Sequence, residues 1–491
     1  MNGRNENHIW EEFTSRAEAY YAGEAPFGEK YRLAYHISPP VAWLNDPNGL
    51  VYHDGVYHLY YQYSAPFFEN CVWAHATTRD FLHYRYEPIA LYPSEGEGMW
   101  SGSAVVDSRN VSGLFDDKGG ILAFYTRFQI AESHQRVELA YSPDGMLFRR
   151  YAGNPIIGNE ERIWDFRDPK TFWHEETGRW ITVVAGGVVR IFSSPDLLHW
   201  TFESDCPDIQ TECPDLFPLA VDGDPERQKW VLSLGGRAYI VGAFDGKRFI
   251  PESEPIPMNG GTDCYATQTF SDIPAQDGRR IAVSWMDCWD NVNRPFQSLS
   301  LPVALTLRTN PQGQVRLYQQ PIAEMRGLRG EAWEAPRQTL REGERLICPL
   351  RTELCEIHVE ASAACGEVRL HVLQSGEEST VIGCRPATGE VFVDRRRAGK
   401  NEYTAKCPDV FTAMVTPGES VHIEAWVDRG SVEVFFNDGE QAFAALVYPL
   451  GEEGGITLEA VGGDADIRRM EVHRLRPITW EKGDLQRKPV E

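Results

Sequence analysis

The sequence lacks any long hydrophobic run. Its apolar stretches, such as residues 181–189, are far shorter than the roughly 20 residues that an apolar helix needs to cross a bilayer. The first residues, MNGRNENHIWEEF, also lack the basic segment and apolar segment that together mark a secretory signal. These absences predict a soluble, cytoplasmic protein without a membrane partner.

Positive charge is scarce in this chain. Lys and Arg together number 48 against 72 Asp and Glu, which gives a formal net charge of −24 and a pI near 5.0. Such a surface repels phosphate backbones and anionic lipid, so no nucleic-acid partner is expected. A neutral small molecule or oligosaccharide is a better substrate for a protein of this charge.

Clusters of cysteine and histidine are absent as well. The ten cysteines are scattered singly, with no CxxC pair and no Cys/His group at metal-ligand spacing. We therefore expect no metal, no cofactor, and free thiols in a reducing compartment. The cysteines are Cys71, Cys206, Cys213, Cys264, Cys288, Cys348, Cys355, Cys365, Cys384 and Cys407.

Helical patterns are few, and strand patterns dominate. Apolar residues recur at helical spacing only from about Ile9 to Tyr21, which predicts an N-terminal helical extension over residues 1–30. From Tyr31 onward, short runs rich in β-branched and aromatic residues alternate with Gly, Asp, Asn and Pro, a pattern typical of many antiparallel strands. A chain of 491 residues also exceeds what one hydrophobic core usually organises, so we expect at least two domains.

A weak internal repeat divides the first of these domains. A turn with nearby aromatic residues recurs around Asp80, Asp144, Asp196 and, more faintly, Asp245, at intervals of 64, 52 and 49 residues. A period of about 50 residues in an all-β chain indicates four-stranded propeller blades, although chance recurrence in a strand-rich chain is the alternative. We assign residues 31–325 to a β-propeller catalytic domain of five or six blades.

The C-terminal third has a different pattern. Charged and breaker residues concentrate in residues 326–345, which predicts a linker. Alternating apolar and polar segments follow, with Asn437-Asp438-Gly439 as a hairpin turn, so residues 346–480 are predicted to form a β-sandwich. The apolar alternation favours a sandwich that packs against the propeller over a separate lectin.

Three acidic residues have neighbours that a solvated surface would not use. Asp46 lies in WLNDPNG, Asp168 in WDFRDP, and Glu212 in TECPDLF. Each could instead serve an Asx-turn, a salt bridge or a hydrogen bond that closes a blade. In a propeller, however, the innermost strand of every blade lines the central channel, so acids from three blades can meet at its mouth.

If these acids meet, glycoside hydrolysis is the natural chemistry. One carboxyl must stay protonated to donate to the leaving oxygen, and another must be ionised to attack the anomeric carbon. A Ca²⁺ site would require acids at closely alternating positions in one loop, and none is seen. Arg167 next to Asp168 should keep that acid ionised, whereas the apolar neighbours of Glu212 favour a protonated carboxyl.

Taken together, the motifs resemble those of glycoside hydrolase family 32, which contains invertases, levanases, exo-inulinases and sucrose-6-phosphate hydrolases. The resemblance extends from about Tyr35 to Arg476. Any one motif is weak evidence, but all of them in the family's order is a specific signal. The motifs are WLNDPNG from Trp43, WSGSAV from Trp100, FRDPK from Phe166, ECPDLF from Glu212, DCYATQTF from Asp263, SWM from Ser284 and VDRGSVEVF from Val427.

The resemblance implies an all-β fold, with a five-bladed β-propeller followed by a C-terminal β-sandwich. It implies Asp46 as nucleophile, Asp168 as transition-state stabiliser and Glu212 as general acid/base of a retaining, exo-acting β-fructofuranosidase. The implied substrates are sucrose, fructo-oligosaccharides, levan and inulin. The substrate-binding residues that it implies are Asn45, Gln62, Trp73, Trp100, Ser101, Arg167, Tyr265 and Trp285.

The sequence departs from the family's usual pattern away from the three acids. Phe68 stands where an aromatic of another kind is expected, Cys264 precedes Tyr265 where Phe is usual, and residues 301–305 replace a Pro-Arg-Glu segment. These changes affect which fructoside is cut. A fructosyltransferase, including one that forms difructose anhydride, and a sucrose-6-phosphate hydrolase stay open as alternatives, as does a non-catalytic fructan-binding protein. A homo-oligomer is compatible with the sequence.

Overall fold

The computed structural model describes residues 30–40, 42–65, 70–116, 118–286, 297–363, 366–400 and 408–483. The predicted N-terminal helix, Ile9 to Tyr21, lies outside these residues, as does Phe68. The seven cysteines within the described ranges are free, and the other three, Cys288, Cys365 and Cys407, lie outside them. Over the described part of the chain, no helix has the length and apolar character that crossing a membrane requires.

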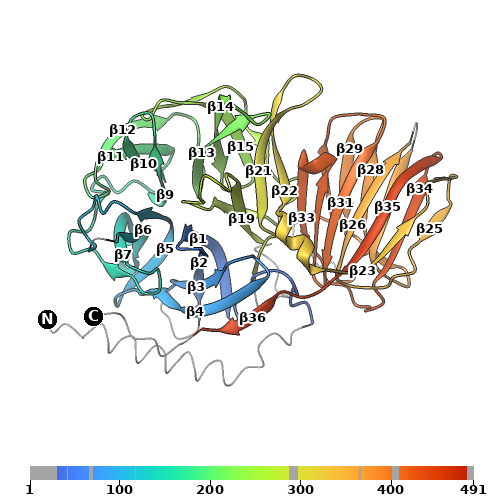
Figure 1. Cartoon of the computed structure of the whole chain (residues 1–491), viewed down its shortest axis with the longest axis horizontal. Helices are drawn as coiled ribbons and strands as arrows, with labels where there is room; N and C mark the ends of the chain where they lie inside the picture. Colours follow the sequence, from blue (N-terminus) through green and yellow to red (C-terminus); the bar gives the residue numbers. More distant parts are fainter. Residues whose placement is uncertain are drawn as a thin grey trace.

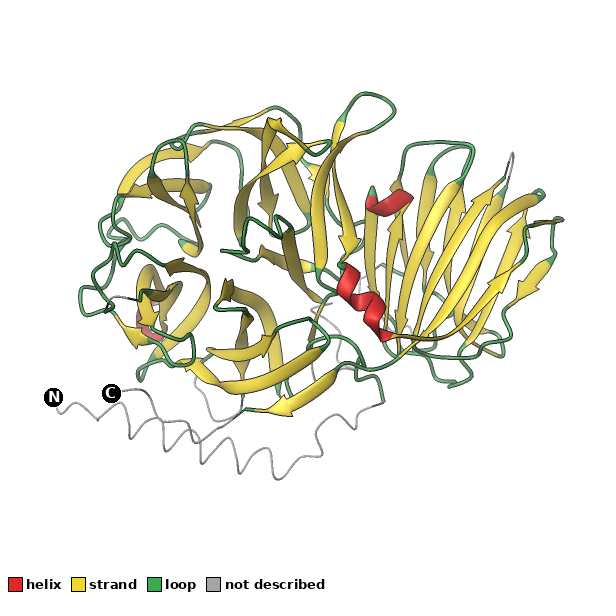
Figure 2. Ribbon diagram, in the orientation of Figure 1, coloured by secondary structure: helices red, strands yellow, loops and turns green. Residues whose placement is uncertain are grey.

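The predicted fold class is confirmed: a five-bladed propeller is followed by a β-sandwich (Figure 1). Strands make up nearly all of the regular structure (Figure 2). The first blade contains β1 (Trp43–His53), β2 (Val56–Ser64), β3 (Val72–Thr78) and β4 (His83–Leu91). The second contains β5 (Glu97–Asp107), β6 (Gly120–Gln129), β7 (His134–Ser142) and β8 (Arg149–Arg150), with η1 (Ile130–Glu132) after β6. The third contains β9 (Arg167–His174), β10 (Arg179–Ala185), β11 (Val189–Ser194) and β12 (Thr201–Cys206).

The fourth and fifth blades are joined into one sheet by a parallel pairing of Val221 with Leu307. The fourth blade contains β13 (Pro214–Val221), β14 (Asp224–Leu234), β15 (Ala238–Phe244), β16 (Phe249–Pro251) and β17 (Ile256–Pro257). The fifth contains β18 (Tyr265–Thr269), β19 (Arg280–Met286), β20 (Ser298–Leu299), β21 (Val303–Thr309) and β22 (Val315–Pro321).

The internal repeat marks the outer turn of each of the first four blades. Asp80 Oδ1 accepts the backbone N–H groups of residues 82 and 83, both at 2.9 Å, between β3 and β4. Asp144, between β7 and β8, accepts one backbone N–H group, and Asp196, between β11 and β12, and Asp245, between β15 and β16, accept two each. In the fifth blade Asn310 takes this place, with Oδ1 accepting the N–H groups of residues 312 and 314. An amide can replace the carboxylate because the turn needs only an acceptor, so the Asp pattern missed this blade.

The sandwich begins earlier than predicted. Within residues 326–345, η2 (Ala323–Leu328) ends, and β23 (Arg329–Ala335) and β24 (Gln338–Leu340) pair with β35. The charged residues that suggested a linker lie on an exposed edge strand, where charge is tolerated and discourages further pairing. The first sheet consists of β23, β24, β35 (Ala465–Leu475), β26 (Cys355–Ser362), β31 (Val421–Asp428), β32 (Ser431–Phe436) and β33 (Gln441–Leu446), with η3 (Asn437–Gly439) between the last two.

The second sheet completes the sandwich, and the chain then returns to the propeller. This sheet consists of β25 (Arg345–Ile347), β34 (Gly455–Val461), β27 (Glu367–Ser375), β28 (Glu378–Arg385), β29 (Glu390–Asp394) and β30 (Val410–Met414). The sandwich was predicted to continue to residue 480, but β36 (Thr479–Lys482) pairs in parallel with β4 of the first blade (Figure 1). Trp480 stacks on Tyr86 at 4.0 Å between ring centroids, which ties this strand to the propeller.

A buried ionic group joins the two domains. His36, before the first blade, lies with Nδ1 2.9 Å from Asp428 and Nε2 2.7 Å from Glu433, and all three side chains are buried. Burial alone would lower the pKa of His36, but hydrogen bonds to the two carboxylates and their charge raise it from 6.5 to about 9. The protonated imidazole therefore stabilises the contact between propeller and sandwich.

Because His36 is charged in the folded protein, we predict that the stability of the fold depends on pH. Because the pKa of His36 rises from 6.5 to about 9 on folding, its contribution, roughly 3 kcal/mol, is complete below pH 6.5 and is lost as pH rises to about 9. We expect His36→Gln to be less stable than the unsubstituted protein at pH 6, with a gap that narrows towards pH 10. Urea unfolding at several pH values measures the gap, and a gap independent of pH would contradict the assigned charge.

Candidate active site

The inner strands of the five blades bring the predicted site residues to one end of the channel. Asp46 lies on β1, Ser101 on β5 and Asp168 on β9, whereas Glu212 lies two residues before β13 and Tyr265 begins β18. These five strands are the innermost of their sheets, and neighbouring inner strands contact one another around the channel. Residues that are more than 200 positions apart in sequence thereby form one group.

A ring of amide and hydroxyl groups fixes the Asp46 carboxylate. Ser101 Oγ donates to Asp46 Oδ2 at 2.5 Å, and Asn45 Nδ2 lies 3.3 Å from Asp46 Oδ1. Gln62 links the two donors, because its Oε1 accepts from Asn45 at 2.5 Å and its Nε2 donates to Ser101 Oγ at 2.5 Å. Burial raises the pKa of Asp46, and the hydrogen bond from Ser101 opposes this rise. Four predicted residues therefore form one connected network.

Cys213 lies between two of the acids, a role that the motif analysis did not assign to it. Its backbone N–H donates to Asp168 Oδ2 at 2.9 Å, and its Sγ lies 3.5 Å from that oxygen and 3.6 Å from Asp46 Oδ2. Cys213 and Asp168 have positive φ angles of 47° and 59°, and Ala266 has one of 50°. Non-glycine residues in this region carry strain that surrounding structure must hold, and such strain concentrates at functional sites. The position of Cys213 next to Glu212 was the available sequence signal.

The charge of Arg167 has a weaker effect on Asp168 than the sequence suggested. Burial raises the pKa of Asp168 from 3.8 to about 7, and the charge of Arg167 only partly opposes this effect. Arg167 Nε lies 3.8 Å from Asp168, whereas the end of its guanidinium group is directed to Asp165, at 2.8 Å, and to Glu212. Adjacency in sequence placed the arginine near Asp168, but the side chain binds other carboxylates more closely.

The side chains around Glu212 are polar, whereas apolar surroundings were expected from the sequence. Its side chain is 42% exposed, Oε1 accepts from Arg167, and Oε2 accepts from the hydroxyl of Tyr265. Burial raises the pKa of Tyr265, so this hydroxyl stays a donor at neutral pH. The carboxyl group is thus open to a ligand on one side and held by two donors on the other.

The three predicted tryptophans differ in their access to the site. Trp100 is partly exposed, stacks on Phe128 at 4.1 Å, and lies 5.5 Å from the Arg167 guanidinium carbon. Trp73 and Trp285 are wrong as direct ligand contacts, because both side chains are fully buried. Trp73 packs below Gly49 and donates to the Trp100 carbonyl at 3.0 Å, and Trp285 packs edge-to-face with Trp43. Both support the strands that carry the site.

One exposed aromatic residue near the site was not assigned from the sequence. Trp164 is 70% exposed and lies in the loop that leads into β9. Asn159 pins this loop, since its side chain accepts the N–H of Ile163 at 2.8 Å and donates to the Ile163 carbonyl at 3.0 Å. The next residue after Trp164 is Asp165, which is ion-paired with Arg167. The tryptophan therefore stands on a fixed loop beside the group that contacts Glu212.

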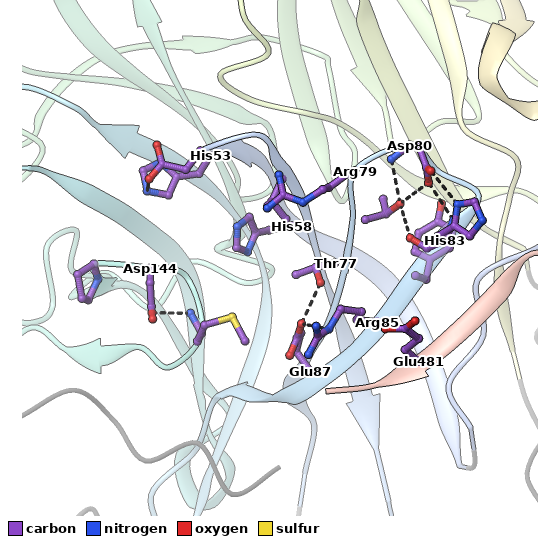
Figure 3. Close-up of a pocket in the computed structure, with 16 residues that line it drawn as sticks. His53, His58, Thr77, Arg79, Asp80, His83, Arg85, Glu87, Asp144 and Glu481 are labelled. Carbon is purple, nitrogen blue, oxygen red and sulfur yellow. Dashed lines mark hydrogen bonds and ion pairs between the residues drawn. The ribbon is translucent and has the colours of Figure 1, made fainter. Parts of the chain in front are cut away.

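A separate polar pocket lies at the outer side of the first two blades and does not contain the acids. It has a volume of about 580 Å³ and is lined by His53, His58, Arg79, Asp144 and other mostly polar residues (Figure 3). Many of its charged groups already have partners, such as Asp80 with His83 at 2.7 Å and Glu87 with Thr77 at 3.0 Å. We place the active site at the channel mouth instead, because the converging acids, the strained backbone and the raised pKa values are found there.

A second cluster of acids and histidine lies in the sandwich. Among the described residues, Glu356, His358 and Glu424 come close enough to hold a metal ion. The Arg329 guanidinium already donates to both oxygens of Glu356, and the indole of Trp426 donates to Glu424 at 2.9 Å. The positive charge beside this cluster is therefore supplied by an arginine of the same chain. We assign the cluster a structural role.

Comparisons with known proteins agree with this geometry. The sequence profile of the glycosyl hydrolases family 32 N-terminal domain matches residues 36–321, and that of the family 32 C-terminal domain matches residues 324–474. A levanase of Bacillus subtilis (strain 168) is 35% identical over 93% of this chain and 72% of its own length. An extracellular exo-inulinase of Aspergillus niger is 30% identical over 92% of this chain and 96% of its own. The crystal structure of the exo-inulinase from Aspergillus awamori superposes with a TM-score of 0.84 at 28% identity, covering 92% of this chain and 100% of that one.

Asp168 predicts a second pH effect on stability, opposite in sign to that of His36. The folded state raises the pKa of Asp168 from 3.8 to about 7, so ionisation destabilises the fold progressively between these pH values, by roughly 4 kcal/mol once complete. Asp168→Asn removes this ionisation and should raise the melting temperature at pH 8 but leave it nearly unchanged at pH 4. Calorimetry at both pH values measures the difference. Asp116→Asn, which changes an exposed carboxylate in the loop between β5 and β6, is the control. Equal shifts of the melting temperature of Asp168→Asn at the two pH values would contradict the prediction.

Proposed function

Because this chain belongs to glycosyl hydrolase family 32, we propose that it is a retaining, exo-acting β-fructofuranosidase that removes terminal fructosyl residues from fructans, fructo-oligosaccharides and sucrose. The observation that carries the proposal is the meeting of Asp46, Asp168 and Glu212 at the channel mouth, two of them on either side of one sulfur atom. The activities of the relatives, levanase and exo-inulinase, support the substrate class. An intact set of three acids disfavours a protein that only binds fructan.

In the first step, the ionised Asp46 attacks the anomeric carbon of the terminal fructosyl unit. The bond from this carbon to the leaving oxygen breaks, a bond to the Asp46 carboxylate forms, and Glu212 gives its proton to the leaving oxygen. Ser101 and Asn45 hold the attacking carboxylate in one orientation through their hydrogen bonds. Their contribution is positional, since a nucleophile that is already aligned loses little entropy on reaction.

In the second step, water replaces the Asp46 ester. Glu212, now ionised, takes a proton from the water as its oxygen attacks the anomeric carbon, and Asp46 departs as a carboxylate. Two inversions at one carbon give net retention. Asp168 is proposed to bind hydroxyl groups of the sugar, for which its burial and its hydrogen bond from the Cys213 N–H provide a fixed position. Both proposed steps use only side chains of this chain and one water molecule.

We assign Trp164 to the sugars on the leaving-group side of the cleaved bond. The ring is exposed and its loop is pinned, which is the arrangement of a preformed stacking surface. Its Cα lies at most about 11 Å from that of Arg167, because three peptide units separate them. We infer that a second or third sugar unit of a fructan contacts the ring, and such a contact would favour oligomers over sucrose.

The role of Glu212 can be tested by chemical rescue. Glu212→Ala should slow sucrose cleavage by about 10²- to 10⁴-fold, because a sugar alkoxide is a poor leaving group without a proton. With an aryl fructoside, whose leaving group needs no proton, the rate of forming the fructosyl-enzyme should fall far less. Azide needs no base and should then accelerate turnover of the aryl substrate and appear as a fructosyl azide of retained configuration.

Asp46→Asn is the matched control for this experiment. It removes the nucleophile and should abolish turnover of both substrates, with no response to azide, while the circular dichroism spectrum is preserved. If Glu212→Ala lowers the cleavage rate by the same factor for the two substrates and azide has no effect on the rate, Glu212 is not the acid/base. Asp215, three residues further along the chain and within β13, would then be the residue to test.

The role of Trp164 predicts a change in substrate preference. Trp164→Ala should raise KM for fructan oligosaccharides by about three- to tenfold, equivalent to roughly 1 kcal/mol, with little change in kcat or in KM for sucrose. Trp164→Tyr should retain most of the preference. Phe202→Ala, at an exposed aromatic on the outer strand β12, is the control, and equal changes for sucrose and oligosaccharides would refute the assignment.

A further inference from the structure

One loop of the propeller lies directly along the edge of the sandwich. Residues 258–264, between β17 and β18, form a parallel bridge from Asn259 to Ala442 of β33, and the Gly260 N–H donates to the Ala442 carbonyl at 2.9 Å. Figure 1 shows β33 on the side of the sandwich that faces the propeller. A Cβ atom on Gly260 would come within 2.3 Å of the Phe443 ring, and one on Gly261 within 2.6 Å of the Phe411 ring. The loop has no room to move towards the sandwich.

A buried ion pair fastens the end of this loop. Arg395, which follows β29 of the sandwich, donates from Nη1 to Asp263 Oδ2, and neither side chain is exposed. The same Nη1 donates to the Leu446 carbonyl at 2.9 Å, and the Leu446 N–H donates to Asp263 Oδ2 at 2.9 Å. Arg395 Nε and Nη2 donate to the Pro408 carbonyl at 3.2 and 3.0 Å. Asp263 is thus held from the sandwich by a side chain and a backbone amide.

Two residues connect this ion pair to the catalytic group. Cys264 is buried in an apolar cluster with Leu446 of the sandwich, and Tyr265 then donates its hydroxyl to Glu212. The Cα atoms of Asp263 and Tyr265 can lie at most about 7 Å apart, so the backbone at Asp263 sets where Tyr265 begins. The Tyr265 ring is held on its flanks as well, since the Arg237 guanidinium carbon lies 4.7 Å from its centroid and Gly235 leaves no space for a Cβ.

Glu212 depends on this support because the Tyr265 hydroxyl is one of the two donors that hold its carboxyl group. Its side chain is 42% exposed, and Arg167 donates to its other oxygen. A half-exposed carboxyl can adopt several rotamers, and a displacement of about 1 Å from the productive geometry can cost about 10²-fold in rate. A tyrosine whose own position is fixed removes this freedom.

We propose that Arg395 and Asp263 are positioning residues for catalysis, through which the sandwich holds the Tyr265 hydroxyl on Glu212. The sandwich is then part of the catalytic apparatus rather than an independent module. This inference rests on the proposed role of Glu212 as acid/base. It predicts that loss of the ion pair impairs proton delivery to the leaving group more than substrate binding.

The test uses the full chain and removes both charges together. Asp263→Asn combined with Arg395→Met avoids an unpaired buried charge, which would itself destabilise the fold. We expect kcat for sucrose to fall about tenfold or more while KM changes by less than about threefold. The rate of fructosylation by an aryl fructoside, measured in a single turnover, should fall much less. The matched control is Glu356→Gln with Arg329→Met, an ion pair of the sandwich with a buried glutamate and a partly exposed arginine.

A double-mutant cycle with Tyr265→Phe separates positioning from a general structural effect. If the ion pair acts through the tyrosine, the pair variant should lower kcat little further once Tyr265 has lost its hydroxyl. The proposal is overturned if the losses of kcat from the pair variant and from Tyr265→Phe multiply. It is also overturned if the pair variant loses the same factor in rate on both substrates, or if the control pair shows the same losses of rate. Should the double variant not fold, Arg395→Lys keeps the charge and should still lower kcat for sucrose about threefold, and unchanged kinetics would overturn the proposal.

The two proposals fail in different ways. If the unsubstituted protein cleaves no fructoside, or Glu212→Ala is insensitive to the leaving group and to azide, the proposed function fails. If those experiments succeed but the Asp263 and Arg395 variants behave like the control pair, only the positioning role fails.

Discussion

The convergence of the five inner strands at one end of the channel is the constraint on which the site depends. Asp46, Asp168 and Glu212 come from three blades, and Ser101 and Tyr265 come from the other two. No blade alone holds more than one of the three acids. The propeller must therefore close before any of the chemistry is possible, and the buried aromatic and aliphatic residues between the blades serve this closure.

Bringing acids together out of water is unfavourable, and the structure compensates locally. Burial raises the pKa of both Asp46 and Asp168. Ser101, Asn45 and the Cys213 amide supply hydrogen bonds to these carboxylates, while the backbone at Asp168 and Cys213 adopts left-handed angles. The rigid blades hold this strained arrangement, which a single loop could not maintain against the repulsion of the acids.

The sandwich meets the propeller through charge as well as apolar contact. His36 lies between Asp428 and Glu433 at one part of the interface, and Arg395 holds Asp263 at another. Buried groups of this kind fix one relative placement of two surfaces, because a shift would leave a charge unpaired in a medium of low polarity. Such an interface explains how a domain without catalytic acids can still influence the geometry of the site.

The fold class and most blade turns could be predicted from the sequence alone, because strand periodicity and Asp-containing turns are local signals. Short motifs also singled out three acids that the structure brings together. Tertiary structure alone decided which groups share an environment. Sequence adjacency suggested that Arg167 ionises Asp168 and that Glu212 is in apolar company, yet the guanidinium end binds Asp165 and Glu212 instead. Likewise, residues 326–345 had the composition of a linker but form edge strands, and Trp73 is buried. Burial and the direction of long side chains arise from contacts between distant segments, which local patterns do not encode.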